Sequence, residues 1–225
     1  MDAAKTSLRS KDGKLALDYL KDSRKFSDKV IDDFDIGYCP ENTYHDLAGR
    51  IITPIYDIYG ETVAISTRHL DKNHKMRFWH ESFDKGSYLF GLHRAKEAIR
   101  KYNKVIIVEG EFDTIAYHSY GINMTVGCCG SALTLFQIAF LSRYCTDIYL
   151  MFDGDVAGRK STKRIMEMKD RYSLDVYGLN FIPVYLPKDT DPDDFLFEVG
   201  AKGVANALKE AKYNSSDVKK EEALI

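Results

Sequence analysis

VIIVEGEFD at residues 105–113 decides how this chain folds, together with MFDGDVAG at residues 151–158. The first stretch opens with β-branched apolar residues, and the second continues an apolar run that starts at Ile148. Short runs of this kind are typical of strands that are buried on both faces. Each run ends in carboxylates beside a glycine. We therefore predict two buried strands whose carboxyl ends carry acidic side chains.

Strand and helix signals alternate through the second half of the chain, which predicts right-handed βαβ crossovers and a mostly parallel sheet. The expected fold class is α/β, with an α+β N-terminal subdomain followed by an α/β subdomain whose sheet is flanked by helices. The expected strands are 104–109, 123–126, 147–152 and 174–185, and the expected helices are 111–120, 134–144 and 156–170.

The flanking segments carry weaker signals. Two short helices are expected at 15–22 and 27–34, the second with Ser27 as its N-cap. Residues 50–70 alternate in polarity and turn at Tyr59-Gly60, as in a β-hairpin. Further helices are expected at 89–102 and 201–211, and the polar segment 213–225 is expected to fray.

The acidic side chains at the two strand ends need a reason to stay together. Glu109 ends one predicted strand, with Asp113 one helical turn later, and Asp153 and Asp155 follow the other strand. Ligands of open α/β sheets bind outside the carboxyl ends of the strands. Clustered carboxylates repel one another unless a hard cation such as Mg²⁺ neutralises them. The alternative is a chance pair of acidic loops in an ordinary α/β domain.

Charge is distributed unevenly along the chain, although the net charge is only −2. Residues 66–104 hold ten Lys or Arg against four acids, whereas residues 105–155 hold Arg143 against six acids. A basic segment beside an acidic pocket suits a polyanion that is held on one side and reacts on the other. Part of the basic segment is also expected to be a solvated helix face.

Other classes of protein are disfavoured by the composition. The cysteines, Cys39, Cys128, Cys129 and Cys145, have no zinc-site spacing and fit free thiols in a reducing compartment. No apolar run approaches the length of a membrane span. Residues 1–14 are polar and do not read as a secretory signal. We therefore expect a cytoplasmic protein without a zinc site or a membrane partner.

The two acidic motifs, EGEFD at 109–113 and DGD at 153–155, resemble the Toprim domain that DnaG-type primases, topoisomerases and some nucleases share. Five further segments resemble the RNA polymerase core of bacterial DnaG-type primases, in the family's order. They are RIITPIYDIYGETVAI at 50–65, RFWH at 77–80, FDKGSYLFGL at 83–92, GSALT at 130–134 and LPKDTDPD at 186–193. The resemblance covers about residues 14 to 210.

This resemblance implies a DNA primase core, a DNA-dependent RNA polymerase that makes short RNA primers on single-stranded DNA from ribonucleoside triphosphates. It implies Mg²⁺ as cofactor, with Mn²⁺ as an alternative. The expected domains are a basic N-terminal primase-core subdomain at 1–103, a Toprim catalytic subdomain at 104–200, and a C-terminal helix and tail at 201–225. Two alternatives stay open, a Toprim nuclease and a non-catalytic module that binds template within a priming complex.

The resemblance also implies roles for individual residues. Glu109, Asp153 and Asp155 are the expected catalytic residues. The metal ligands would be these three together with Asp113, Asp191 and Asp193, although the last two also fit a helix N-cap. Phe78 and Trp79 are expected either to stack on a base or to lie in the core. The expected nucleotide- and template-binding residues are Arg50, Arg68, Lys75, Arg77, Lys85, Gly86, Gly110, Gly130 and Gly154.

Full-length proteins of this family begin with a zinc-binding domain and end with a helicase-binding domain. Neither is expected in this sequence, so it resembles either a piece of a longer primase or a stand-alone product of a phage or mobile element. The expected partners are therefore a replicative helicase and a separate zinc-binding domain or protein.

Overall fold

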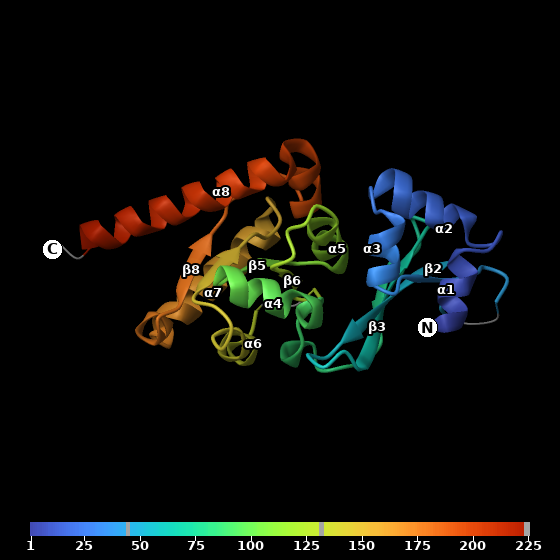
Figure 1. Cartoon of the computed structure of the whole chain (residues 1–225), viewed down its shortest axis with the longest axis horizontal. Helices are drawn as coiled ribbons and strands as arrows, with labels where there is room; N and C mark the ends of the chain where they lie inside the picture. Colours follow the sequence, from blue (N-terminus) through green and yellow to red (C-terminus); the bar gives the residue numbers. More distant parts are fainter. Residues whose placement is uncertain (44–45, 131–132, 223–225) are drawn as a thin grey trace. The chain divides into compact units, whose positions relative to one another are not determined.

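The structure, a computed structural model, describes residues 1–43, 46–130 and 133–222, and the chain divides into two compact units (Figure 1). The first unit is Met1–Asp84 and the second is Lys85–Ile225, whereas the sequence suggests a boundary after residue 103. Residues 85–103 belong to the second unit because the backbone of residues 85–90 forms hydrogen bonds with residues of that unit. The Gln137 side chain donates to the carbonyl oxygens of Lys85 and Tyr88, and Phe90 forms an antiparallel bridge with Gly127.

The first unit contains an antiparallel sheet with the order β1-β2-β3-β4. Its strands are β1 (Gly37–Cys39), β2 (Arg50–Tyr56), β3 (Thr62–His69) and β4 (Phe78–His80). The predicted hairpin is β2–β3, whose turn is held by the Asp57 carboxylate, which accepts the N–H groups of Tyr59 and Glu61. The helices are α1 (Asp2–Leu8), α2 (Lys14–Asp18), the π-helical turn η1 (Tyr19–Ser23) and α3 (Asp28–Asp33).

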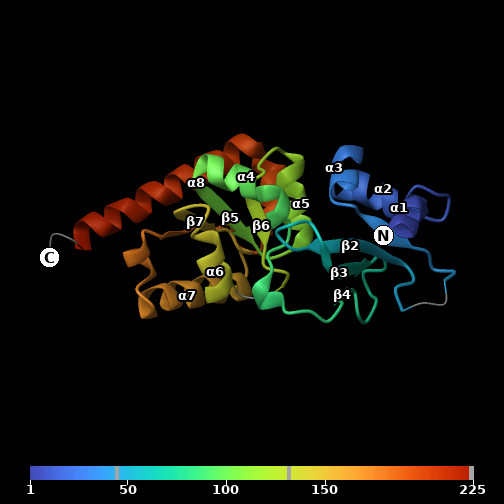
Figure 2. The same ribbon diagram turned by 60° about the horizontal axis from the view of Figure 1, so that its bottom comes forward.

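The second unit contains a parallel sheet with the order β6-β5-β7-β8, which confirms the predicted α/β class. Figure 2 shows α4, α5 and α8 on one face of this sheet and α6 and α7 on the other. The strands are β5 (Lys104–Val108), β6 (Thr125–Gly127), β7 (Asp147–Leu150) and β8 (Asn180–Pro183). The helices are η2 (Lys85–Ser87), α4 (Leu92–Tyr102), α5 (Glu111–Ser119), α6 (Leu135–Leu141), α7 (Val156–Arg171), η3 (Leu174–Tyr177) and α8 (Pro192–Glu222).

The two central strands, β5 and β7, form the core of the second unit. Val105 to Val108 have no exposed surface, and neither do Ile148, Leu150 and Met151. The apolar runs are therefore buried on both faces, as the sequence predicts. This burial holds the carboxyl ends of β5 and β7 at a defined place on the edge of the sheet.

The prediction of a long strand at 174–185 is wrong at its start. Leu174–Tyr177 forms the 3-10 helix η3, and the strand β8 begins only at Asn180. Gly178 separates the two with a φ of +76°, a left-handed conformation that glycine adopts at little cost. The apolar residues before it therefore sit in a helical turn and not in the sheet.

The last helix, α8, is much longer than the sequence suggests. It starts at Pro192, contains a non-helical break at Gly200 and continues to Glu222, so the expected frayed tail is helical over residues 213–222. One long-range contact involves α8: the Lys212 ammonium group donates to the Asp147 carboxylate, which also accepts the Asn180 amide at 3.0 Å. This contact anchors α8 to the amino ends of β7 and β8.

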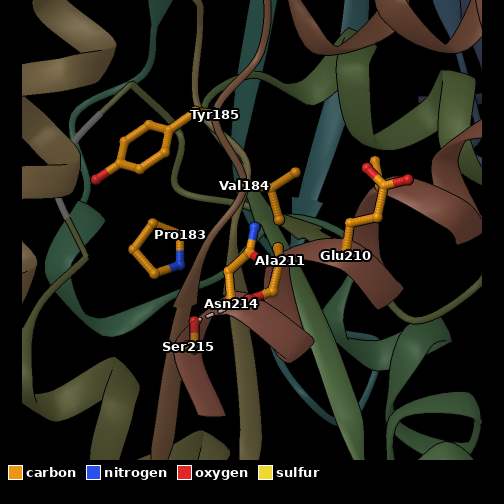
Figure 3. A pocket seen from close by; sticks show the side chains of 8 residues that line it. Pro183, Val184, Tyr185, Glu210, Ala211, Asn214 and Ser215 are labelled. Carbon is orange, nitrogen blue, oxygen red and sulfur yellow. Dashed lines mark hydrogen bonds between the residues drawn. The ribbon is translucent and has the colours of Figure 1, made fainter. Parts of the chain in front are cut away.

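A cavity of about 400 Å³ lies between α8 and the chain around the end of β8 (Figure 3). Pro183, Val184 and Tyr185 line one side, and α8 residues from Ala207 onward line the other. The Ser215 hydroxyl at this wall donates to the Ala211 carbonyl oxygen within α8.

Over the described part of the chain, no helix has both the length and the apolar character needed to cross a bilayer.

Candidate metal and nucleotide site

Glu109 and Asp153 meet at the carboxyl edge of the parallel sheet. β5 and β7 are adjacent strands, with Ile107 opposite Leu150, so the loops that follow them emerge side by side. The Asp153 N–H lies 3.4 Å from the Glu109 Oε1 atom, toward which it points. The structure therefore brings together the two acidic motifs that lie more than forty residues apart in the sequence.

A third acidic loop is held against the second by backbone hydrogen bonds. The Gly154 N–H donates to the Thr190 carbonyl oxygen at 2.9 Å, and the Asp189 N–H donates to the Gly154 carbonyl oxygen at 3.2 Å. There is no room for a side chain between the loops, since a Cβ atom at Gly154 would lie 1.8 Å from the Pro187 carbonyl oxygen. The loop 187–191 thus delivers Asp191 and Asp193 to the same edge.

Asp191 and Asp193 are joined by an acid that the sequence analysis did not include. Ligand oxygens of Asp191, Asp193 and Asp194 all lie within 4.8 Å of one another. Asp193 is 2% exposed, so its carboxylate lies inside the protein at this edge. Asp194 directly follows Asp193 in the sequence. The feature that could have identified it is that it is a second acid in the first turn of α8.

The acidic side chains influence one another electrostatically. The pKa of Asp153 is raised to about 7, mainly by burial and further by the negative charges of Glu109, Asp191, Asp155 and Asp193. Burial also raises the pKa of Glu109, and the charges of Asp155 and Asp191 oppose its ionisation further. Glu109 and Asp153 are therefore two half-buried carboxylates whose ionisation is made less favourable by the acids around them. Such a group is suited to divalent cations.

Two of the predicted ligands also cap helices. The Asp113 Oδ2 atom accepts the Gly110 N–H at 3.2 Å, which fixes the turn between β5 and α5. The Asp155 Oδ1 atom accepts the Gly158 N–H at 2.8 Å and caps α7. Asp155 keeps a second oxygen for other contacts, whereas the contact made by Asp113 orients the Glu109-Gly110 loop.

The remaining sequence-predicted residues of the second unit lie in segments that are held by hydrogen bonds. The Gly130 N–H donates to the Glu109 carbonyl oxygen at 3.3 Å, so the turn after β6 touches the Glu109 backbone. The Gly86 carbonyl oxygen accepts the Thr134 hydroxyl at 2.7 Å, which ties the segment of Lys85 to the N-cap of α6. Ser131 and Ala132, in the predicted turn 130–134, lie outside the described residues.

The predicted basic residues Arg50, Arg68, Lys75 and Arg77 lie in the first unit. Arg50 is 2% exposed, and its guanidinium group donates to the carbonyl oxygens of Met76 at 2.6 Å and Arg77 at 3.3 Å. Burial lowers its pKa. Arg50 thus holds the segment that precedes β4 and carries Lys75 and Arg77, and its contact with phosphate stays a prediction.

Phe78 is an exposed aromatic residue between two arginines. Its side chain is 59% exposed, although it lies in strand β4. The Arg68 guanidinium carbon lies 5.0 Å from the centre of its ring, and that of Arg77 lies 5.3 Å from it. Of the two alternatives for Phe78, a core position and a surface position suited to stacking, the structure has the second.

The raised pKa of Asp153 predicts how stability varies with pH when no metal is bound. In the unfolded chain Asp153 ionises near its ordinary pKa of 3.8, whereas in the folded protein it keeps its proton up to about 7. Its contribution to stability is therefore complete below the unfolded pKa and is lost as the pH rises through 7.

We expect the wild-type protein in EDTA to lose roughly 1–3 kcal/mol more stability than Asp153→Asn between about pH 5 and pH 8. Urea unfolding of both proteins at several pH values measures this difference. Added Mg²⁺ should restore the wild-type stability at the higher pH, because a ligand of the folded state stabilises it. Parallel pH profiles of the two proteins would contradict the expectation.

Comparison with known proteins identifies a family with this fold. Residues 106–196 match the family described as Toprim-like, and this range contains all three acidic loops. The DNA primase of Aquifex aeolicus is 34% identical over 218 aligned residues, and the match covers 82% of this chain and 43% of that protein. The chain thus spans less than half the length of this relative.

Solved structures agree with the sequence comparison. A structure described as the DnaG catalytic core superimposes with a TM-score of 0.83 at 26% identity, covering 93% of this chain and 76% of that one. A DnaG primase catalytic domain bound to single-stranded DNA superimposes with a TM-score of 0.82 at 25% identity, covering 95% and 78%. With its Toprim-like acidic edge and its match to these cores, the chain belongs to the DnaG-type DNA primase family and corresponds to the catalytic core.

Proposed function

We propose that this chain is a DNA-dependent RNA polymerase that makes short RNA primers on single-stranded DNA by metal-dependent nucleotidyl transfer. The observation that carries the proposal is the convergence of Glu109, Asp153 and the 191–194 acids at one edge of the sheet. Membership of the primase family supports the choice of substrates.

The acidic edge fits a hard divalent cation. Its donors are carboxylate oxygens, which Mg²⁺ and Mn²⁺ prefer over nitrogen or sulfur. We propose Mg²⁺ as the cofactor, replaceable by Mn²⁺, and Glu109, Asp153, Asp155, Asp191 and Asp193 as the residues that would hold it. When bound, the cations would supply Lewis-acid stabilisation of the charge that builds on phosphate oxygens.

The chain's own residues would position the reactants and move one proton. In primer extension a ribose 3′-hydroxyl oxygen forms a bond to the α-phosphorus of a nucleoside triphosphate, and pyrophosphate leaves with the electron pair of the broken bond. Where Glu109 does not act as a metal ligand, we propose that it accepts the hydroxyl proton, because burial raises its pKa and so favours proton uptake. Asp113 would act as a positioning residue through its contact with Gly110.

The first unit would bind the template. We propose that Arg68, Lys75 and Arg77 contact phosphate groups and that Phe78 stacks on a base, since it is exposed between two cations. Arg50 would support this surface from below by fixing the carbonyl groups of Met76 and Arg77. Lys85, with Gly86 and Gly130 nearby in the second unit, would contact the nucleotide.

We also propose a role for each of three segments of the chain, and two partners. Residues 1–103 would handle the template, residues 104–200 would carry the chemistry, and residues 201–225 would close the fold. A replicative helicase and a zinc-binding domain or protein would join the chain in a cytoplasmic priming complex. These partners are inferred from the family.

A primer-synthesis assay tests the proposed function. The chain is incubated with labelled ribonucleoside triphosphates, single-stranded DNA and Mg²⁺, with EDTA as the control. We expect labelled, alkali-sensitive oligoribonucleotides that disappear with EDTA. Template fragments without such products would mean a nuclease, and template binding without either product would mean a non-catalytic module. Both results would overturn the proposal.

A further inference from the structure

A second, basic cavity lies directly beside the acidic edge. Its volume is about 420 Å³, and its wall includes Gly154 and Asp155 of the second acidic loop. Four cationic side chains line it, against two acids, and they come from α7 and from the loop after β8. The cations are Arg159, Lys160, Lys163 and Lys188, and the acids are Asp155 and Asp189.

Three of the cations are free to turn toward a ligand at little cost. Lys160, Lys163 and Lys188 are exposed. Lys163 lies 3.8 Å from Glu167, and Lys188 lies 3.8 Å from Asp189. Ion pairs of this length at the surface contribute little, so an anion with several charges can replace them.

The fourth cation, Arg159, shapes the cavity. Its guanidinium group donates to the Leu186 carbonyl oxygen at 2.5 Å and lies 4.8 Å from the centre of the Tyr185 ring. These contacts join α7 to the segment that leads into the 187–191 loop. The lysines on the two sides of the cavity are therefore held in a fixed relation to the loop of Asp155.

The lining indicates the chemical class of the ligand. No aromatic ring is among the described residues that line this cavity, so a nucleobase would find no surface for stacking. The cations approach from two segments around one volume, which suits a compact anion better than an extended strand. Phosphate groups are the anions that clustered Lys and Arg side chains bind most readily.

We propose that this cavity binds the pyrophosphate portion of the nucleotide, first as the β- and γ-phosphates of the incoming triphosphate and then as the leaving group. The inference rests on the proposed nucleotidyl transfer, because that reaction releases pyrophosphate at the acidic edge to which Asp155 belongs. Lys160, Lys163 and Lys188 would neutralise the charge that the leaving pyrophosphate gains. The first turn of α7 would add the positive end of its dipole.

The triple variant Lys160→Ala/Lys163→Ala/Lys188→Ala tests the inference. Titration calorimetry with inorganic pyrophosphate and Mg²⁺ should show a dissociation constant raised about tenfold or more, because three charge-assisted contacts are lost. The matched control is Lys101→Ala/Lys202→Ala/Lys209→Ala, three exposed lysines outside the cavity, which should bind like the wild type. Single Lys→Ala variants repeat the titration in case the triple variant does not fold.

Further measurements separate the possible outcomes. In primer synthesis the KM for the nucleoside triphosphate should rise while the affinity for single-stranded DNA stays unchanged. Unchanged pyrophosphate binding would overturn the inference, and so would a loss confined to DNA affinity, which would assign the lysines to a nucleic acid backbone. If the wild type binds pyrophosphate through these lysines but makes no primers, the cavity assignment holds and the polymerase proposal fails.

Discussion

Asp153→Asn is expected to lower primer synthesis by a factor on the order of 10³ or more, because it removes a charge that would hold the cation against the phosphates. Asn keeps the shape of the side chain but cannot supply an anionic ligand. The fold should survive, since Asp153 is a source of repulsion in the metal-free protein: its pKa is raised by burial and by neighbouring carboxylates. Loss of activity should therefore accompany equal or higher stability in EDTA.

Asp175→Asn is the matched control for this variant. Asp175 is an exposed acid in η3 of the same unit, and the chemical change is identical. Its primer synthesis should stay close to that of the wild type. Activity of Asp153→Asn within about tenfold of the wild type would remove Asp153 from the proposed metal site, because a tenfold change corresponds to only about 1.4 kcal/mol of transition-state stabilisation.

Gly154→Ala is expected to have the second-largest effect, because it separates two of the acidic loops. The new Cβ atom would lie 1.8 Å from the Pro187 carbonyl oxygen and 3.1 Å from that of Thr190. The loops must move apart, which breaks the reciprocal hydrogen bonds of Gly154 with Thr190 and Asp189. We expect a loss of about 2–4 kcal/mol in unfolding free energy and of about 100-fold in primer synthesis.

Gly178→Ala separates this steric effect from the general cost of replacing glycine. Gly178 has a φ of +76° and open space around its Cβ position. Its replacement should cost about 1 kcal/mol through backbone strain and leave primer synthesis intact. Urea unfolding and primer synthesis of both variants give the comparison. Equal activity losses in the two variants would mean that the contact between the loops does not position the acids.

The parts of the fold that the sequence predicts are those with a local signal. β5 and β7 are apolar runs buried on both faces, and the β2–β3 hairpin turns at Tyr59-Gly60. β4 escaped prediction because it has only three residues and exists through its pairing with β3. The length of α8 also had no local signal, because residues 213–222 are mostly polar and yet continue the helix.

The residues of the candidate site also differ in whether the sequence near them predicts their position. Glu109 and Asp153 can be predicted to meet because acids that follow adjacent parallel strands share one edge. Asp191 and Asp193 were named only through the resemblance to a family, since their approach depends on the contact between Gly154 and Pro187. The basic cavity gave no signal, because Lys160 and Lys188 come together only when β7, α7 and β8 are in place.

Anomalous diffraction from crystals soaked in Mn²⁺ tests the central claim most directly, which is that the acidic loops hold divalent cations together. The account predicts anomalous peaks within coordination distance of Glu109, Asp153 or Asp155 on one side and of Asp191 or Asp193 on the other. The peaks should be absent from Asp153→Asn crystals soaked in the same way. Mn²⁺ bound only elsewhere on the protein, or not bound at all, would contradict the account.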